Sequence, residues 1–173
     1  KFSGRIRSLS NNELRKSKYI EVDSVPGGHT MLVNSEAIKA GALPDEKLFF
    51  GFEEFDFCLQ AKIMGFKNYV DARSWLKVRK NTNRGQGNYR WRGNSFGNKD
   101  TLQREFYTTR NLLSILFKNH YYFALVFLLI KSVGKMLLGF RYGLDYGKKI
   151  FHIQFMAIRA FFLKKYGMIG KLY

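Results

Sequence analysis

Residues 45–57 decide the fold, and they read Asp45-Glu46-Lys47-Leu48-Phe49-Phe50-Gly51-Phe52-Glu53-Glu54-Phe55-Asp56-Phe57. An aromatic run meets three acids here, and a helical pattern starts at the same point. Apolar residues then recur at i, i+3, i+4, i+8 and i+11, which is one face of a helix. These residues are Phe55, Cys58, Leu59, Ile63 and Phe66. The stretch therefore predicts a helix that begins at the acids and ends near Gly65.

Short strands are predicted on both sides of this helix. β-branched and aromatic runs bounded by turn residues indicate strands at residues 19–25, 31–33 and 67–70, the second of them buried. A short helix is expected between an N-cap at Asn34 or Ser35 and a closing glycine at position 41. Residues 81–99 are expected to form a loop and residues 101–117 a helix with Leu102, Phe106, Leu113 and Phe117 on one side.

Charge is distributed unevenly along the chain. The net charge is +17, and residues 73–173 carry all of it because the acids and bases of residues 1–72 balance. An excess of this kind indicates a polyanionic partner, such as nucleic acid, anionic lipid or a phosphorylated substrate. A solvated basic surface is the simpler alternative. The single cysteine, Cys58, excludes an intrachain disulfide, and the first residue, Lys1, suggests a fragment or a processed chain.

Two apolar segments follow residue 118. Residues 121–140 are long enough to cross a bilayer, but Lys131 and Lys135 would then lie well inside it, at about 2.5–3.5 kcal/mol each near the centre. The two lysines are four residues apart on one face, which favours a helix lying in the membrane interface. Residues 150–163 repeat the composition with lysines at both ends. A buried core helix is the alternative for either segment.

The acids Glu53, Glu54 and Asp56 have the most chemical promise in the sequence. Three carboxylates in four residues repel one another, and their aromatic neighbours limit solvation, an environment that suits a general base. The alternative is structural, since acids in a first helical turn interact favourably with the helix dipole.

The order of several motifs resembles the second half of family 2 glycosyltransferases, including the rhamnosyltransferase-like enzymes. The motifs are Val22–Val33 with its Pro26-Gly27-Gly28 turn, Asp45–Phe57, Phe106-Tyr107-Thr108-Thr109-Arg110-Asn111, and Tyr166-Gly167-Met168-Ile169-Gly170-Lys171. Phe2-Ser3-Gly4 matches a turn that precedes this region. The resemblance implies an α/β fold: the C-terminal part of a GT-A domain, followed by amphipathic membrane-associating helices. Residues 1–118 would be the acceptor-side part of the catalytic domain and residues 119–173 the basic tail.

The resemblance also implies roles for particular residues. Glu54 stands where the family has the aspartate that takes the proton from the acceptor hydroxyl, and the extra methylene of glutamate moves that carboxylate by about 1.5 Å. Glu53 precedes it, and Asp56 would stabilise the helix start or orient Glu54. Gly27 and Gly28 would let the backbone approach a sugar closely. Where the family often has a histidine this chain has Leu76, so Lys77 or Arg79 would contact substrate by charge instead.

The expected partners are a nucleotide-sugar donor, a saccharide or lipid-linked acceptor, and an anionic membrane surface at the cytoplasmic face. A divalent metal, Mg²⁺ or Mn²⁺, is expected in the complete enzyme through an Asp-x-Asp that this chain lacks, and no metal ligand is assigned here. We expect the chain alone not to catalyse transfer, since it lacks that motif and a glycine-rich phosphate loop.

Two other classes stay open. A basic nucleic-acid-binding module is suggested by residues 84–93, which interleave arginine, glycine and aromatic residues. The apolar helices after residue 120 speak against it, and no nucleic-acid partner is expected. The other class is a membrane-surface interaction module without catalysis.

Overall fold

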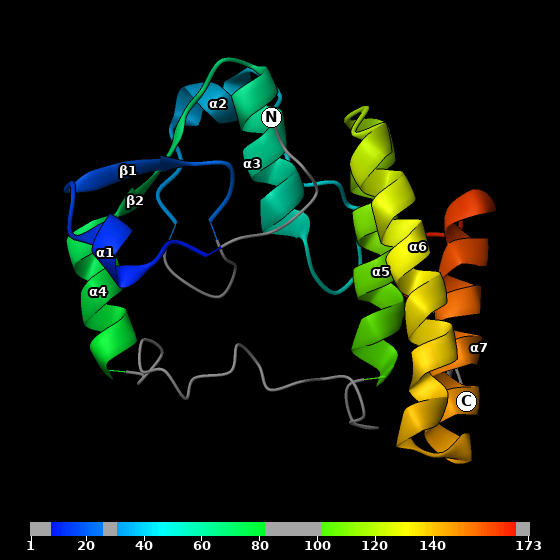
Figure 1. Cartoon of the computed structure of the whole chain (residues 1–173). Coiled ribbons are helices and arrows are strands. Elements are labelled where there is room, and N and C mark those ends of the chain that lie inside the picture. Colours follow the sequence, from blue (N-terminus) through cyan, green and yellow to red (C-terminus); the bar gives the residue numbers. More distant parts are fainter. Residues whose placement is uncertain (1–7, 26–30, 82–101, 169–173) are drawn as a thin grey trace. The chain divides into compact units, whose positions relative to one another are not determined.

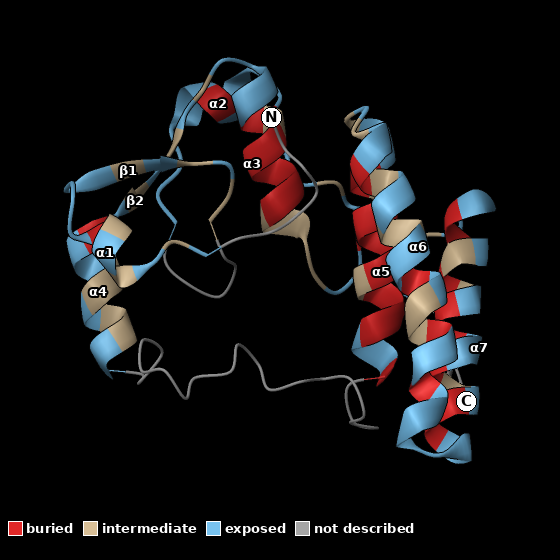
Figure 2. Cartoon of the chain, viewed as in Figure 1, coloured by how far each residue is buried: buried red, intermediate tan, exposed pale blue. Residues whose placement is uncertain are grey.

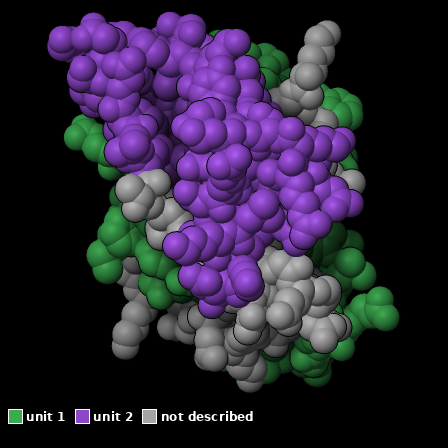
Figure 3. All heavy atoms as spheres, turned by 90° about the vertical axis from the view of Figure 1, so that its left-hand side faces the viewer, with its two compact units in different colours: residues 1–6, 46–52, 94–173 green, residues 7–45, 53–93 purple. Residues whose placement is uncertain are grey.

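The computed structural model describes residues 8–25, 31–81 and 102–168 (Figure 1). The chain divides into two compact units, shown in different colours in Figure 3. One unit comprises residues 7–45 and 53–93 and is called the sheet unit. The other comprises residues 1–6, 46–52 and 94–173 and is called the bundle unit. Each is described by itself.

The sheet unit contains short helices and one pair of strands. Its elements are α1 (Asn11–Leu14), β1 (Tyr19–Val22), α2 (Ser35–Lys39), α3 (Glu53–Ile63), β2 (Asn68–Asp71) and α4 (Ala72–Asn81). The strands pair antiparallel, with Tyr19 opposite Asp71 and Val22 opposite Asn68. The Asn68 amide also donates to the Cys58 carbonyl at 3.0 Å, which ties β2 to α3. The small core consists of Ala37, Ala42, Phe57, Cys58 and Ala61, with Val25 and Phe66 packed against it.

Side-chain caps explain where three of these helices begin. Ser10 and Glu13 form a reciprocal capping box at α1, and the Asn34 carboxamide accepts from the Glu36 amide at α2. At α4, Asp71 accepts from the Ser74 hydroxyl at 2.9 Å and from the Arg73 amide at 3.1 Å. The hydrogen bonds from Ser74 are the main cause that lowers the pKa of Asp71.

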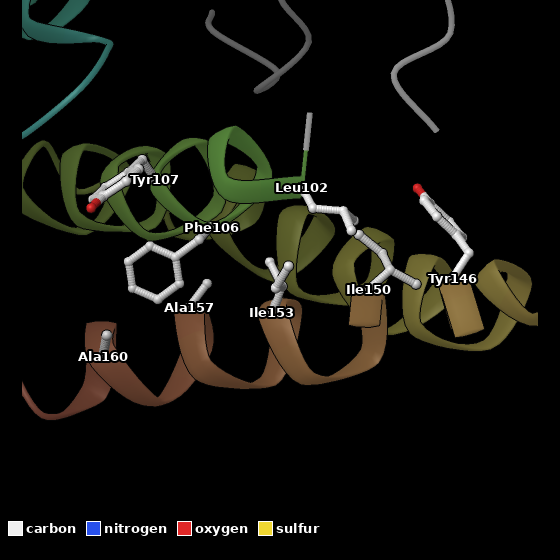
Figure 4. Packing of buried hydrophobic residues seen from close by; sticks show 8 residues of the cluster. All are labelled: Leu102, Phe106, Tyr107, Tyr146, Ile150, Ile153, Ala157 and Ala160. Atoms are coloured by element: carbon white, nitrogen blue, oxygen red, sulfur yellow. The ribbon is translucent and has the colours of Figure 1, made fainter. Parts of the chain in front are cut away.

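The bundle unit is a packed set of three long helices. They are α5 (Leu102–Lys118), α6 (Tyr122–Leu138) and α7 (Leu144–Phe162), with the 3₁₀ turn η2 (Gly139–Tyr142) between the last two. Figure 4 shows side chains from α5 and α7 meeting in the core. The core residues are Leu102, Phe106, Tyr107, Tyr146, Ile150, Ile153, Ala157 and Ala160. Two glycines allow close approach here, since a Cβ on Gly139 would lie 2.2 Å from Ile150 Cγ2 and one on Gly147 2.5 Å from Phe140 Cδ1.

A network of hydrogen bonds and one ion pair within the bundle joins all three helices. The Lys135 ammonium on α6 donates to the Glu105 carboxylate on α5 and forms an ion pair with it. The Gln154 amide on α7 donates to the same carboxylate at 3.2 Å, and its oxygen accepts from the Thr109 hydroxyl at 2.9 Å. Gln154 is fully buried and Lys135 has a quarter of its side chain exposed. These groups satisfy one another inside the bundle.

Several sequence expectations are confirmed by the described residues. The strands at 19–22 and 68–71, the short helix after Asn34, and the helices α3, α5, α6 and α7 all lie where the patterns predict them. Gly41 and Gly65 take positive φ angles of 95° and 88°, as expected of glycines that end helices.

Other expectations are wrong. Residues 31–33 form no strand and are exposed, Leu32 at 95 % (Figure 2). Ile63 and Phe117, expected on apolar helix faces, are more than half exposed. Residues 72–81 form α4, a helix that the sequence patterns did not predict.

The class is α/β only in a coarse sense, since the described residues are mostly helical with one two-stranded sheet. In the bundle unit α5 packs with α6 and α7, and the division at residue 118 into a catalytic part and a basic tail stays a prediction. The predicted loop begins at residue 81, but Asn81 is the last residue of α4, and the rest of the predicted loop, residues 82–99, lies outside the described residues.

Candidate functional site

Three of the motifs quoted above meet in the bundle unit, in what we call the motif cluster: residues 47–52, 107–111 and 166–167. Asn111 Nδ2 donates to two backbone carbonyls, those of Phe49 at 3.0 Å and Gly51 at 2.9 Å. Arg110 Nη1 donates to the Gly167 carbonyl at 2.8 Å. The Gly167 amide in turn donates to the Lys47 carbonyl at 3.1 Å. Segments some 60 residues apart in sequence are therefore hydrogen-bonded to one another.

Arg110 and Asn111 are themselves a bonded pair. Arg110 Nε and Nη2 both donate to Asn111 Oδ1, at 3.0 and 2.9 Å. Both residues are fully buried, and the guanidinium lies over the rings of Phe106 and Tyr107. Burial lowers the pKa of Arg110 from its high ordinary value. The buried Arg110 guanidinium therefore binds groups of the chain itself, namely the Gly167 carbonyl and the Asn111 side chain.

The 47–52 segment has an unusual backbone. Phe50, Gly51 and Phe52 follow one another with φ angles of 64°, 114° and 74°. Glycine adopts this region freely, but a bulky residue there is an outlier that costs on the order of 1–3 kcal/mol. Such a conformation persists only where the surroundings hold it, and the hydrogen bonds from Asn111 to Phe49 and Gly51 hold this one.

Aromatic side chains line the outside of the cluster. The Phe49 and Phe50 rings lie 5.1 and 5.8 Å from the ring of the buried Tyr107. The Arg104 guanidinium lies 5.4 Å from the centre of the Phe50 ring. Phe50 is about half exposed at 49 %. The cluster thus presents aromatic surface directly before the acids in the chain.

The predicted acids occupy the first turn of α3, in the sheet unit. Glu53 and Glu54 are half-buried, whereas Asp56 is fully buried. Asp56 Oδ2 accepts from Gln60 Nε2 at 2.6 Å, and the same amide nitrogen donates to the Leu43 carbonyl at 3.0 Å. Asp56 therefore takes part in the internal structure of this unit, while the two glutamates keep access to solvent.

One turn further along α3 lies the buried thiol of Cys58. Burial raises the pKa of Cys58, the Glu54 carboxylate raises it further, and a hydrogen bond with the Val25 backbone opposes them. The thiolate is the reactive form of cysteine, so this environment makes the group inert.

We expect Cys58 in the folded chain to react with iodoacetamide at pH 8 at least about 100-fold more slowly than a free thiol. Mass spectrometry of the alkylated protein measures this rate, and full reactivity in 6 M guanidinium chloride is the control. A rate equal to that of a free thiol in the folded state would contradict the placement of Cys58 in the core.

Of the remaining predicted substrate-binding residues, the structure describes Lys77 and Arg79, both on α4. Lys77 is exposed on α4. Arg79 Nη1 donates to Asn11 Oδ1 at 2.8 Å and Nη2 to the Leu9 carbonyl at 2.6 Å, so its guanidinium ties α4 to the chain at α1. Gly27 and Gly28 lie outside the described residues. Val25 and Met31, the nearest described residues on either side, line a cavity with Phe57 and Phe66.

Within residues 8–25, 31–81 and 102–168, no group of three histidine, cysteine or acidic residues is arranged to hold a metal ion. Comparisons with protein families, with curated proteins and with solved structures each give no match to this chain.

The contact between Asn111 and the 47–52 segment is a feature of the candidate site that sequence reasoning missed. The motif resemblance marks both positions, but nothing in their spacing shows that they touch.

Proposed function

We propose that this chain is the acceptor side of an inverting glycosyltransferase of the family 2 type, with Glu54 as the general base. The observation that supports the proposal is the motif cluster. Three separate motifs of the resemblance contribute to this cluster, namely residues 47–52, 107–111 and 166–167. Hydrogen bonds of Asn111, Arg110 and Gly167 join them. Motifs that share one functional site are expected to meet in this way.

The proposed reaction uses the carboxylate of Glu54 as follows. Glu54 takes the proton from an acceptor hydroxyl, and the oxygen attacks the anomeric carbon of the donor sugar. The bond from that carbon to the diphosphate breaks, and the nucleoside diphosphate leaves with the electron pair. Half-buried Glu54 suits this role because it combines access to the acceptor with limited solvation. Buried Asp56 would act by supporting the first turn of α3.

The donor side of the site is expected elsewhere in the natural protein. A divalent metal bound through an Asp-x-Asp would neutralise the leaving diphosphate there. Lys77 and Arg79 remain candidates for charge contacts to substrate, although Arg79 already binds Asn11 and Leu9.

We further propose that the bundle unit lies on an anionic membrane surface at the cytoplasmic face. Along α6, apolar side chains that are each about half exposed or more form one outward face: Phe123, Val126, Phe127, Ile130, Val133 and Leu137. The exposed residues of α7 include basic and aromatic types, among them Lys148, Phe151, Phe155, Arg159 and Phe162. An apolar face with basic residues beside it fits a lipid surface with negative headgroups.

Within the described part of the chain, α6 and η2 together, residues 122–142, are the one helical segment long and apolar enough to cross a membrane. Lys131 lies near the middle of this helix and is exposed. Placing that charge at the bilayer centre costs about 2.5–3.5 kcal/mol, so we favour a helix in the plane of the interface.

The membrane contact predicts the effect of two surface substitutions. Phe123→Glu and Ile130→Glu together should lower binding to vesicles containing phosphatidylserine by about 100-fold, since each removes about 1.4 kcal/mol of apolar burial. Both residues are well exposed, at 80 % and 65 %, so the fold should persist. Vesicle co-sedimentation measures the loss. Leu32→Glu, at the exposed apolar residue of the sheet unit, is the matched control and should bind like the wild type. Equal losses in both variants would contradict the proposed face.

A non-catalytic membrane-surface module is the second candidate, and the same exposed face of α6 supports it. The natural coding sequence separates the two functions. We expect it to encode, before this region, strand–helix units with an Asp-x-Asp. A start codon close to Lys1 would favour the module without catalysis.

A further inference from the structure

We propose that Asn111 is a positioning residue: its carboxamide holds the strained segment that leads into α3, and Arg110 sets the orientation of that carboxamide. This role rests on the proposed function, in which Glu54 near the start of α3 is the base. Asn111 touches no reacting atom in the proposal. It acts through the backbone of Phe49 and Gly51.

The hydrogen bonds define the orientation of the Asn111 amide. A guanidinium has donors and no acceptor, so the atom that receives two bonds from Arg110 is the amide oxygen. The amide nitrogen then faces the two carbonyls of the segment, and both of its protons are used. Arg110 is held in turn by the Gly167 carbonyl and by stacking on Phe106 and Tyr107. The Arg110–Asn111 pair therefore attaches the 47–52 segment to the core of the bundle.

The segment needs such support because its backbone is strained. Phe50 and Phe52 each hold a positive φ that costs on the order of 1–3 kcal/mol. Each hydrogen bond from Asn111 contributes about 1 kcal/mol net. The two terms are comparable, so loss of the amide donor should weaken the support of the strained segment and make its backbone more accessible.

Support of the segment matters for the proposed base because only one peptide bond separates Phe52 from Glu53. A change of φ at Gly51 or Phe52 would alter the backbone immediately before the first residue of α3. Misplacement of a catalytic group by about 1 Å costs about 100-fold in rate. Asn111 is uncharged and takes no part in the proposed proton transfer. Its loss should therefore lower kcat without changing how kcat depends on pH.

Asn111→Asp is the main test. One carboxylate oxygen still accepts from Arg110, while the other faces the carbonyls of Phe49 and Gly51 and repels them. We expect chymotrypsin to cleave after residues 49, 50 and 52 at least tenfold faster than in the wild type. In the full natural protein, kcat should fall about 100-fold with unchanged KM for the donor and an unchanged pH profile.

Gly51→Val is the second variant, because its added side chain meets open space but its φ of 114° is strained. It should give the same two changes with the α5 helix intact.

Ile153→Ala is the control, since it creates a cavity in the bundle core without touching the segment. It should lower the melting temperature and leave kcat within about twofold. Unchanged cleavage in both Asn111→Asp and Gly51→Val would overturn the inference, as would faster cleavage with wild-type kcat. If the two variants are cleaved faster but the wild-type natural protein transfers no sugar, the supporting role of Asn111 stands and the proposed function is overturned instead.

Discussion

Glu54→Gln should lower kcat for sugar transfer by the full natural protein by 10²- to 10⁴-fold, the range typical of a lost general base. Glutamine keeps the size of the side chain and its place in the first turn of α3, but it takes up no proton. The nucleotide-sugar KM should change little, since Glu54 acts on the acceptor. Initial rates with radiolabelled donor measure the loss.

Two substitutions serve as controls for this result. Glu53→Gln removes the same charge one residue earlier and should cost less than tenfold. Glu54→Asp keeps a carboxylate that is shorter by about 1.5 Å, so it should retain more activity than Glu54→Gln. Equal rates for wild type and Glu54→Gln would remove Glu54 from the chemistry and favour a membrane module without catalysis.

Lys135→Met should destabilise the bundle unit by about 3 kcal/mol, because it removes one partner of the partly buried ion pair between Lys135 and Glu105. The carboxylate is nearly buried, with 10 % of the side chain exposed, and it also accepts from the Gln154 amide. Urea unfolding followed by circular dichroism measures the change in the free energy of unfolding.

The matched control lies one helical turn away. Lys131→Met removes an exposed charge from the same helix and should change stability by less than about 0.5 kcal/mol. The double variant Glu105→Gln with Lys135→Met removes both charges and keeps an acceptor for Gln154, so it should return to within about 1 kcal/mol of the wild type. A loss for Lys131→Met as large as for Lys135→Met would show that the ion pair is not what stabilises the helices.

The long helices could be predicted from sequence because their apolar spacing is regular. Leu102, Phe106 and Leu113 recur at helical intervals and are all fully buried in α5. Shorter signals failed for a physical reason. Three apolar residues at 31–33 resemble a buried strand, but so short a run carries no period, and the residues are exposed. The helix α4 is rich in charged residues, and its few apolar residues, among them Ala72, Trp75 and Leu76, are not readily recognised as one helical face.

Contacts between distant segments account for what the sequence could not show. Lys131 and Lys135 look equivalent as two lysines on one face, yet Lys135 pairs with Glu105, thirty residues earlier. Asn111 and Phe49 are 62 residues apart, and only the folded chain shows that one supports the other. Asp56 and Glu54 are two residues apart, and their different burial follows from Gln60 and Leu43, which no acidic pattern reveals.

The most direct test of the account is a transfer assay on the full natural protein with a panel of nucleotide sugars. The acceptors are membrane lipids of the source cell, and the products are identified by mass and anomeric configuration. The account predicts one donor sugar added to a saccharide or lipid-linked acceptor, with inversion at the anomeric carbon. Transfer with retention, or vesicle binding without transfer from any donor, would contradict it.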